Sequence, residues 1–162
     1  KQLLLGAALV DVGIRAKEIA ALTVGDVYDE QGSVREQFAL DAVQTKGAKT
    51  RTVWINAKLR RQLELYRSSL LFKDSNRALF QSQKGGAFSA NTMTQLFLNI
   101  YRAAGFKNAS SHSGRRTFIT ELASKGVSVR VLAELAGHSS IQTTQRYIDV
   151  NPQQMSAAVE LL

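Results

Sequence analysis

The sequence of 162 residues contains no cysteine and a single proline, and these absences exclude several kinds of protein. Without cysteine there is no disulfide, no thiolate nucleophile and no cysteine-ligated zinc site, and the absence fits a reducing compartment. No apolar run approaches the roughly 20 residues that a helix needs to cross a bilayer. The chain also lacks a low-complexity linker and an internal repeat. We therefore expect one compact domain over residues 1–162.

Acidic residues are scarce relative to basic ones. The chain has 21 Lys and Arg against 13 Asp and Glu, a net charge of +8. No Asp or Glu occurs from Ser75 to Thr120, and Glu64 is the one acid from Gln44 to Arg67. This charge predicts an anionic partner, first nucleic acid and second an acidic membrane, although an ordinary solvated face has the same composition. We favour DNA because the acids are missing over a long stretch. The residues expected to contact DNA are Lys49, Arg51, Arg102, Lys107 and Arg116.

The spacing of apolar residues predicts a mainly α fold with a small antiparallel β-sheet, an α+β class. Two strands are expected, joined by a turn at 46–49, while 24–27 leaves the helical pattern. Ser89 and Ser128 are expected to cap helices that stop at Gly105 and Gly137. The predicted strands are 34–45 and 50–55, and the predicted helices are 1–10, 16–22, 57–71, 89–104, 113–125, 128–136, 141–148 and 152–162.

Two isolated cations precede the longer motifs. Arg15 stands at the start of a predicted helix, where Glu18, one turn on, can hold its guanidinium. Taken alone, Arg15 is interpreted as a surface arginine, because such ion pairs contribute little to stability. Lys46 lies at the tip of the predicted hairpin, which is usually a solvated position. A flexible ammonium there could instead reach a phosphate and protonate a leaving oxygen, a role for which Lys49 is the alternative.

His112 and Arg115 lie three residues apart at a predicted helix start, which puts both side chains on one side of the first turn. The free N–H groups of a helix N-terminus favour an anion. A capping histidine beside a surface arginine would give the same pattern. The only other histidine, His138, follows Gly137 in a turn, where a lone histidine is commonly structural.

Tyr147 falls on a predicted amphipathic helix, where tyrosine usually belongs to the core or its rim. A phenol, with an ordinary pKa of about 10, becomes a usable nucleophile only when cations or a base assist it. Several cations around one phosphate and one attacking phenol together predict a site of phosphodiester transfer.

Four segments carry this pattern in order: GIRAKEIAAL at 13–22, TKG at 45–47, HSGRRTF at 112–118 and LAGHSSIQTTQRY at 135–147. They resemble, in order and spacing, the first arginine box, the hairpin lysine, the H-x-x-R box and the final box of the tyrosine recombinases, the phage integrase family. The resemblance covers nearly the whole chain. It implies the catalytic-domain fold of the DNA breaking-rejoining enzymes, starting inside the family's first catalytic helix and without its N-terminal DNA-clamping domain.

The resemblance also implies a mechanism. Tyr147 would attack the scissile phosphate to form a 3′-phosphotyrosyl link, while Arg15, Arg115 and His138 bind the non-bridging oxygens. His112 would accept the phenol proton and Lys46 would protonate the departing 5′-oxygen, with Glu18 in a supporting role. No metal and no cofactor is expected, because the fixed cations take the place of a metal.

Double-stranded DNA is the expected partner, with no membrane contact and a location in the cytoplasm with the nucleoid. The resemblance implies a monomer alone and a tetramer on paired DNA sites, assembled through the C-terminal helix. That helix could equally pack on its own chain; its apolar residues are Met155, Ala158, Val159, Leu161 and Leu162.

Two other functions fit parts of the sequence. A type IB topoisomerase shares the chemistry but reseals the same strand, and the short chain and recombinase-like final box argue against it. A non-catalytic DNA-binding module would read 127–147 as a helix-turn-helix, with the turn at Gly137-His138-Ser139. Such a binder gives no reason to combine Arg15, His112, Arg115, His138 and Tyr147.

Overall fold

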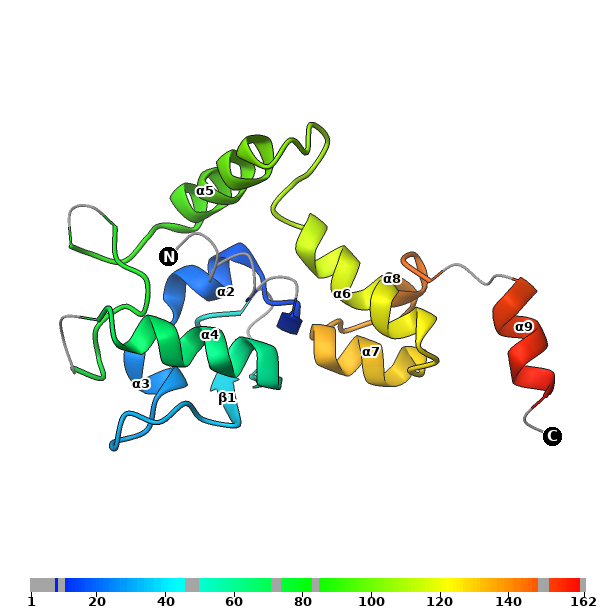
Figure 1. Cartoon of the computed structure of the whole chain (residues 1–162), viewed down its shortest axis with the longest axis horizontal. Coiled ribbons are helices and arrows are strands. Elements are labelled where there is room, and N and C mark those ends of the chain that lie inside the picture. The colour runs from blue at the N-terminus through cyan, green and yellow to red at the C-terminus, as the bar shows by residue number, and fades with distance from the viewer. Residues whose placement is uncertain are drawn as a thin grey trace.

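The computed structural model describes residues 8, 11–45, 50–70, 74–82, 85–148 and 152–160; in the last range the side chains of 152–154 and 157 are not described. It confirms the mainly α class with a small antiparallel sheet (Figure 1). The helices are α2 (Ala16–Ala21), α3 (Val24–Val27), α4 (Ala57–Arg67), α5 (Ala90–Ala103), α6 (Ser113–Ser124), α7 (Val129–Ala136), α8 (Ile141–Gln145) and α9 (Pro152–Val159). No helix among the described residues is long and apolar enough to cross a membrane.

The helix caps agree with the sequence pattern. Ser89 accepts a hydrogen bond from the N–H of Thr92 at the start of α5, and Ser128 accepts one from Val131 at the start of α7. Gly137 ends α7 with a left-handed φ of 60°. These groups satisfy N–H donors that the first helical turn leaves free, so the boundaries follow from local chemistry.

One short helix was not expected. Residues 24–27 form α3 because Thr23 and Asp26 cap each other: Thr23 N–H donates to the Asp26 carboxylate at 2.7 Å, and Asp26 N–H donates to the Thr23 hydroxyl at 3.3 Å. The prediction that this segment leaves the helical pattern was therefore wrong. Gly25 is a poor helix former, but the reciprocal cap stabilises the helix.

The two strands are shorter than predicted. β1 (Gln37–Leu40) pairs antiparallel with β2 (Arg51–Trp54), with Phe38 opposite Val53 and Leu40 opposite Arg51. The first strand stops at Leu40 because the Asp41 carbonyl accepts hydrogen bonds from the N–H groups of Gln44 and Thr45, which turns the chain. The predicted hairpin tip at 46–49 lies outside the described residues, as does the predicted helix at 1–10 apart from Ala8.

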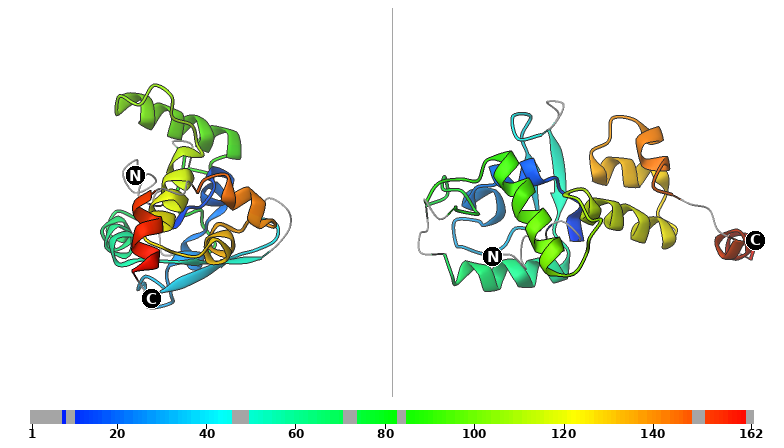
Figure 2. Two further views of the ribbon diagram at one scale, coloured as in Figure 1. Left: turned by 90° about the vertical axis from the view of Figure 1, so that its right-hand side faces the viewer. Right: turned by 90° about the horizontal axis from the view of Figure 1, so that it is seen from above.

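Two hydrophobic clusters hold the fold. The larger one joins α2 to α5 and the sheet, and includes the fully buried Ile14, Ile19, Leu40 and Phe97. The smaller one joins α6 to α8 around Ile119, Leu132 and Ala136. The sheet and α2 to α5 form one group of elements, and α6, α7 and α8 form a second group beside it (Figures 1 and 2). The helix α9 lies beyond the second group. The polar residues of interest lie where the two clusters meet.

Candidate active site

The centre of the site is the C-terminal end of α7. His138 N–H donates to the Ala133 carbonyl and Gly137 N–H to the Glu134 carbonyl, both at 2.9 Å. This pair of bonds is the Schellman arrangement, which satisfies two of the carbonyls that a helix end leaves free. The next carbonyls along the chain, those of Leu135, Ala136 and Gly137, remain available to other donors.

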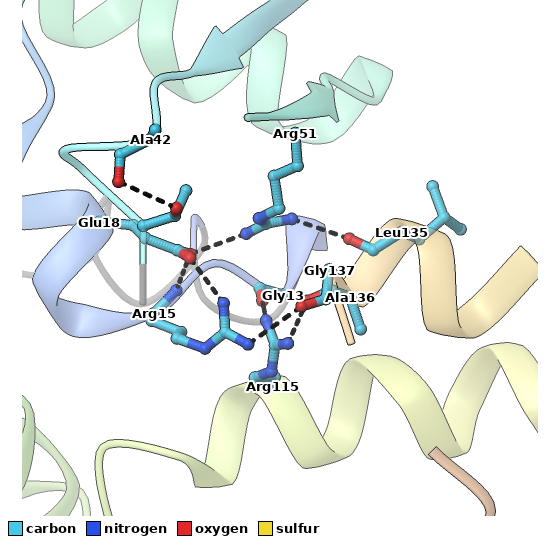
Figure 3. A network of polar contacts seen from close by, with 10 residues as sticks. Gly13, Arg15, Glu18, Ala42, Arg51, Arg115, Leu135, Ala136 and Gly137 are labelled. Carbon is cyan, nitrogen blue, oxygen red and sulfur yellow. Dashed lines mark hydrogen bonds and ion pairs between the residues drawn. The ribbon is translucent and has the colours of Figure 1, made fainter. Parts of the chain in front are cut away.

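Three arginines from three different elements take these three carbonyls (Figure 3). Arg51 of β2 donates to the Leu135 carbonyl at 2.8 Å, and Arg15, just before α2, donates to that of Gly137 at 3.3 Å. Arg115 of α6 donates to the Ala136 carbonyl and also to the Gly13 carbonyl, the latter at 2.6 Å. The negative end of a helix dipole favours cations, so α7 fixes three guanidiniums side by side. A guanidinium has five N–H donors, so Arg15 and Arg115 retain donors beyond the bonds named here.

Glu18 is the single carboxylate within this group and is fully buried. One oxygen accepts from the Arg15 guanidinium at 2.7 Å, and the other accepts from Arg51 at 2.7 Å and from the Arg15 backbone N–H at 2.8 Å. Burial alone would raise the pKa of Glu18. The charge and hydrogen bond of Arg51, with those of Arg15, outweigh burial and hold the pKa below its ordinary value. Glu18 is thus ionised and orients both arginines.

Two glycines let these elements approach each other closely. Gly13 has a φ of 60°, and a Cβ there would lie 2.5 Å from the Phe118 ring of α6. Gly137 has the same φ, and a Cβ there would lie 2.5 Å from Cδ of Arg51. A side chain at either position would push Arg115 or Arg51 away from the carbonyl that holds it, so both positions require glycine.

The cations control the protonation of their neighbours. Burial and the charges of Arg15 and Arg51 lower the pKa of Arg115 to about 9, so Arg115 stays charged at neutral pH. Burial, followed by the charges of Arg115, Arg15 and Arg51, lowers the pKa of His138 to about 4. His138 is therefore neutral at pH 7 and donates through a single ring N–H.

Tyr147 lies beside this group. Its ring stacks on the His138 ring, with the two centroids 6.3 Å apart. The Arg116 guanidinium lies over the Tyr147 ring, 6.0 Å from the ring centroid. The phenols of Tyr28 and Tyr66 instead donate to core carbonyls, and burial raises the pKa of both. Of Tyr28, Tyr66 and Tyr147, Tyr147 is thus the one beside His138.

The comparisons with known proteins decide the family. The sequence pattern of the phage integrase family matches residues 2–154. The chain belongs to the phage integrase family. It is 34% identical over 151 residues to tyrosine recombinase XerC of Myxococcus xanthus, covering 88% of this chain and 48% of that protein. It is 29% identical over 158 residues to tyrosine recombinase XerA of Pyrococcus furiosus, covering 94% and 51%. The chain spans about half the length of the curated relatives that it matches.

Solved structures agree on the fold. A crystal structure of XerA recombinase superposes with a TM-score of 0.76 at 23% identity, covering 99% of this chain and 60% of that one. XerH site-specific recombinase, solved bound to its palindromic difH substrate in a post-cleavage complex, gives 0.71 at 26% identity, covering 98% and 44%. The predicted tyrosine-recombinase catalytic fold is confirmed.

Of the six predicted catalytic residues of this phage integrase family member, the structure brings four together: Arg15, Arg115, His138 and Tyr147. His112 is exposed at the N-cap of α6, and its side chain does not cap the helix. Tyr147 lies in the turn after α8 and not in a helix to 148, because its N–H bonds back only three residues, to Thr144 at 3.0 Å. Lys46, like Lys49, lies outside the described residues.

Arg51 is a correction to the basic-surface interpretation. Its side chain is 7% exposed, and both terminal nitrogens are used inside the protein. The strand explains this, because Arg51 shares its inward face with Val53. Arg102, Lys107 and Arg116 are exposed. Sequence reasoning also missed Thr144, which is fully buried and lies beside His138.

Proposed function

We propose that this chain is the catalytic domain of a site-specific DNA recombinase, or integrase, that cuts and rejoins DNA strands by transesterification. One arrangement carries the proposal: Arg15, Arg115 and His138 gather at the end of α7, and Tyr147 stacks on His138. Three guanidiniums against one buried carboxylate leave an excess of positive charge at the point where the phenol lies. A phosphodiester is the anion that suits this combination.

In the proposed reaction the Tyr147 oxygen attacks the scissile phosphorus and forms a 3′-phosphotyrosyl bond, while the bond to the 5′-oxygen breaks. Arg15, Arg115 and His138 contact the non-bridging oxygens and stabilise the charge that grows in the transition state. His112 accepts the phenol proton, and Lys46 gives a proton to the departing oxygen. Attack by the 5′-hydroxyl of another strand reverses these steps, rejoins the DNA and frees Tyr147.

The proposed reaction uses neither a metal nor ATP. The fixed guanidiniums supply the positive charge that stabilises the transition state, and the phosphotyrosyl bond retains the energy needed for rejoining. We therefore expect DNA cleavage to continue in the presence of a metal chelator.

Double-stranded DNA is the proposed partner, and the exposed residues Arg102, Lys107 and Arg116 are proposed to contact its phosphates. The proposed location is the cytoplasm, with the nucleoid. The chain is proposed to be a monomer alone and a tetramer on paired sites, with α9 seated on a neighbouring copy. The exposed apolar residues Met155 and Val159, at 54% and 68%, support this role for α9.

The test is an incubation of the chain with supercoiled plasmid in EDTA, stopped with SDS, beside Tyr147→Phe. We expect a protein–DNA adduct from the wild type and none from Tyr147→Phe, whereas the control Tyr101→Phe keeps the adduct. Exchange of strands between two DNA duplexes indicates a recombinase, whereas relaxation of the plasmid without exchange indicates a topoisomerase.

Equal adduct from wild type and Tyr147→Phe would overturn the assignment of the nucleophile. DNA binding without adduct from either protein would favour the non-catalytic binding module. The helix-turn-helix interpretation of that module has little support from geometry, because α8 has only 5 residues.

A further inference from the structure

Thr144 links the two residues at the centre of the proposed reaction. Its side chain is fully buried, and its hydroxyl lies 2.8 Å from Nδ1 of His138. Its backbone carbonyl accepts the N–H of Tyr147 at 3.0 Å. One residue of α8 therefore contacts both the imidazole and the chain segment that carries the phenol.

The direction of the Thr144–His138 bond decides what the imidazole can do. A neutral imidazole has one N–H donor and one bare nitrogen. If the hydroxyl donates to Nδ1, the ring hydrogen is on Nε2, and Nε2–H can donate to a phosphate oxygen. If Nδ1–H donates to the hydroxyl, Nε2 is bare and can only accept.

The surroundings of Thr144 favour donation by the hydroxyl. Among the hydrogen bonds of the described residues, His138 Nδ1 is the one acceptor within reach of this hydroxyl. A buried hydroxyl hydrogen without an acceptor destabilises the fold, because it has lost its hydrogen bond to water and gained none in return. When Thr144 donates, its hydroxyl hydrogen has an acceptor. When Nδ1–H donates to Thr144, that hydroxyl hydrogen has none. The three arginines near His138 are donors only and offer it no alternative.

We infer that Thr144 is a positioning residue: its hydroxyl donates to Nδ1 of His138, holds the ring in the Nε2–H tautomer and so leaves Nε2–H free to donate to an anion. That this anion is the scissile phosphate rests on the proposed function, whereas the tautomer itself does not. The backbone of Tyr147 is hydrogen-bonded to the same residue, so Thr144 fixes the position of the His138 ring relative to the segment that carries the phenol.

The chain offers a matched set of variants. Thr144→Val keeps the shape and removes the donor, and Thr144→Ser keeps the hydroxyl. The adjacent Thr143 is exposed, so Thr143→Val is the control for a valine in α8. The sequence has 2 histidines, and His112→Gln assigns the imidazole signals of His138 by elimination.

The first readout is the tautomer at pH 7, from long-range ¹H–¹⁵N correlation spectra of the imidazoles. We expect His138 to carry its hydrogen on Nε2 in the wild type, Thr144→Ser and Thr143→Val, and to become a mixture of tautomers in Thr144→Val. A wild-type His138 with its hydrogen on Nδ1 would overturn the inference, as would an unchanged tautomer in a folded Thr144→Val. If Thr144→Val fails to fold, the wild-type and Thr144→Ser spectra still decide.

The second readout is the rate of adduct formation on plasmid DNA at equal DNA binding. Removing the partner that orients a metal-ligating histidine commonly costs about 10–100-fold. We expect a loss of that size in Thr144→Val and recovery in Thr144→Ser. An unchanged rate in Thr144→Val would overturn the role of Thr144 in the reaction. A wild type that forms no adduct would overturn the proposed function instead, and the spectra alone would then settle the tautomer.

Discussion

Glu18 is the anion on which two of the arginines depend, and replacing it with glutamine tests this dependence without changing the shape of the side chain. The carboxylate is fully buried and accepts three hydrogen bonds, from the Arg15 backbone, the Arg15 guanidinium and the Arg51 guanidinium. A glutamine amide has one carbonyl oxygen that can accept. Its NH₂ group faces an arginine N–H, and two donors cannot form a hydrogen bond with each other. Glu18→Gln therefore leaves buried positive charge without a counter-ion.

The size of the effect follows from this unpaired charge. Removing one partner of a buried ion pair costs about 3–5 kcal/mol, because the other charge stays buried. For a domain of this size, each kcal/mol lowers Tm by about 2–4 °C, so the expected drop in Tm is roughly 6–20 °C. No cavity forms, so the loss reports electrostatics and hydrogen bonding alone.

The assay is urea denaturation of the wild type, Glu18→Gln and the control Glu64→Gln, which changes an exposed residue of α4. The control should stay within about 0.5 kcal/mol of the wild type. Adding Arg51→Met to Glu18→Gln removes one unpaired cation, so the double variant should lose at least about 1 kcal/mol less than the sum of the single losses. A loss below about 1 kcal/mol in Glu18→Gln, or strictly additive losses, would refute the reasoning.

Further predictions concern a glycine and a histidine. Gly137→Ala should destabilise the fold by at least about 1 kcal/mol more than Gly126→Ala in urea denaturation, because both have positive φ but only the Cβ at 137 meets Arg51; equal losses would contradict the close approach. Stability should fall as pH drops from about 6.5 towards 4, because the pKa of His138 is about 4 when folded and 6.5 ordinarily, so the unfolded chain takes up the proton first. His138→Gln should flatten this slope, and a slope unchanged by His138→Gln would contradict the shift.

Much of the fold follows from local sequence signals. Serine caps and the glycine after α7 marked helix boundaries because side-chain capping is a short-range effect. A signal for α3 was also present in the sequence, since Thr23 and Asp26 have the spacing of a capping box. The end of β1 depended on the turn at Asp41, which alternation of apolar residues does not reveal.

The site was only partly predictable. The order of the motifs indicated that Arg15, Arg115, His138 and Tyr147 act together, and the structure places them at one point. That the arginines are held by consecutive carbonyls of α7 could not be predicted, because every residue has a carbonyl and the contacts depend on tertiary packing. The inward position of Arg51 did have a signal, since it alternates in register with Val53.

The most direct test of the central claim is to identify the residue that carries DNA after reaction. The adduct formed in EDTA and SDS is digested with nuclease and protease, and the peptide that bears a nucleotide is sequenced by mass spectrometry. Of the 4 tyrosines in the chain, we expect Tyr147 to carry the nucleotide. A nucleotide on Tyr28, Tyr66, Tyr101 or a residue of another type would contradict it.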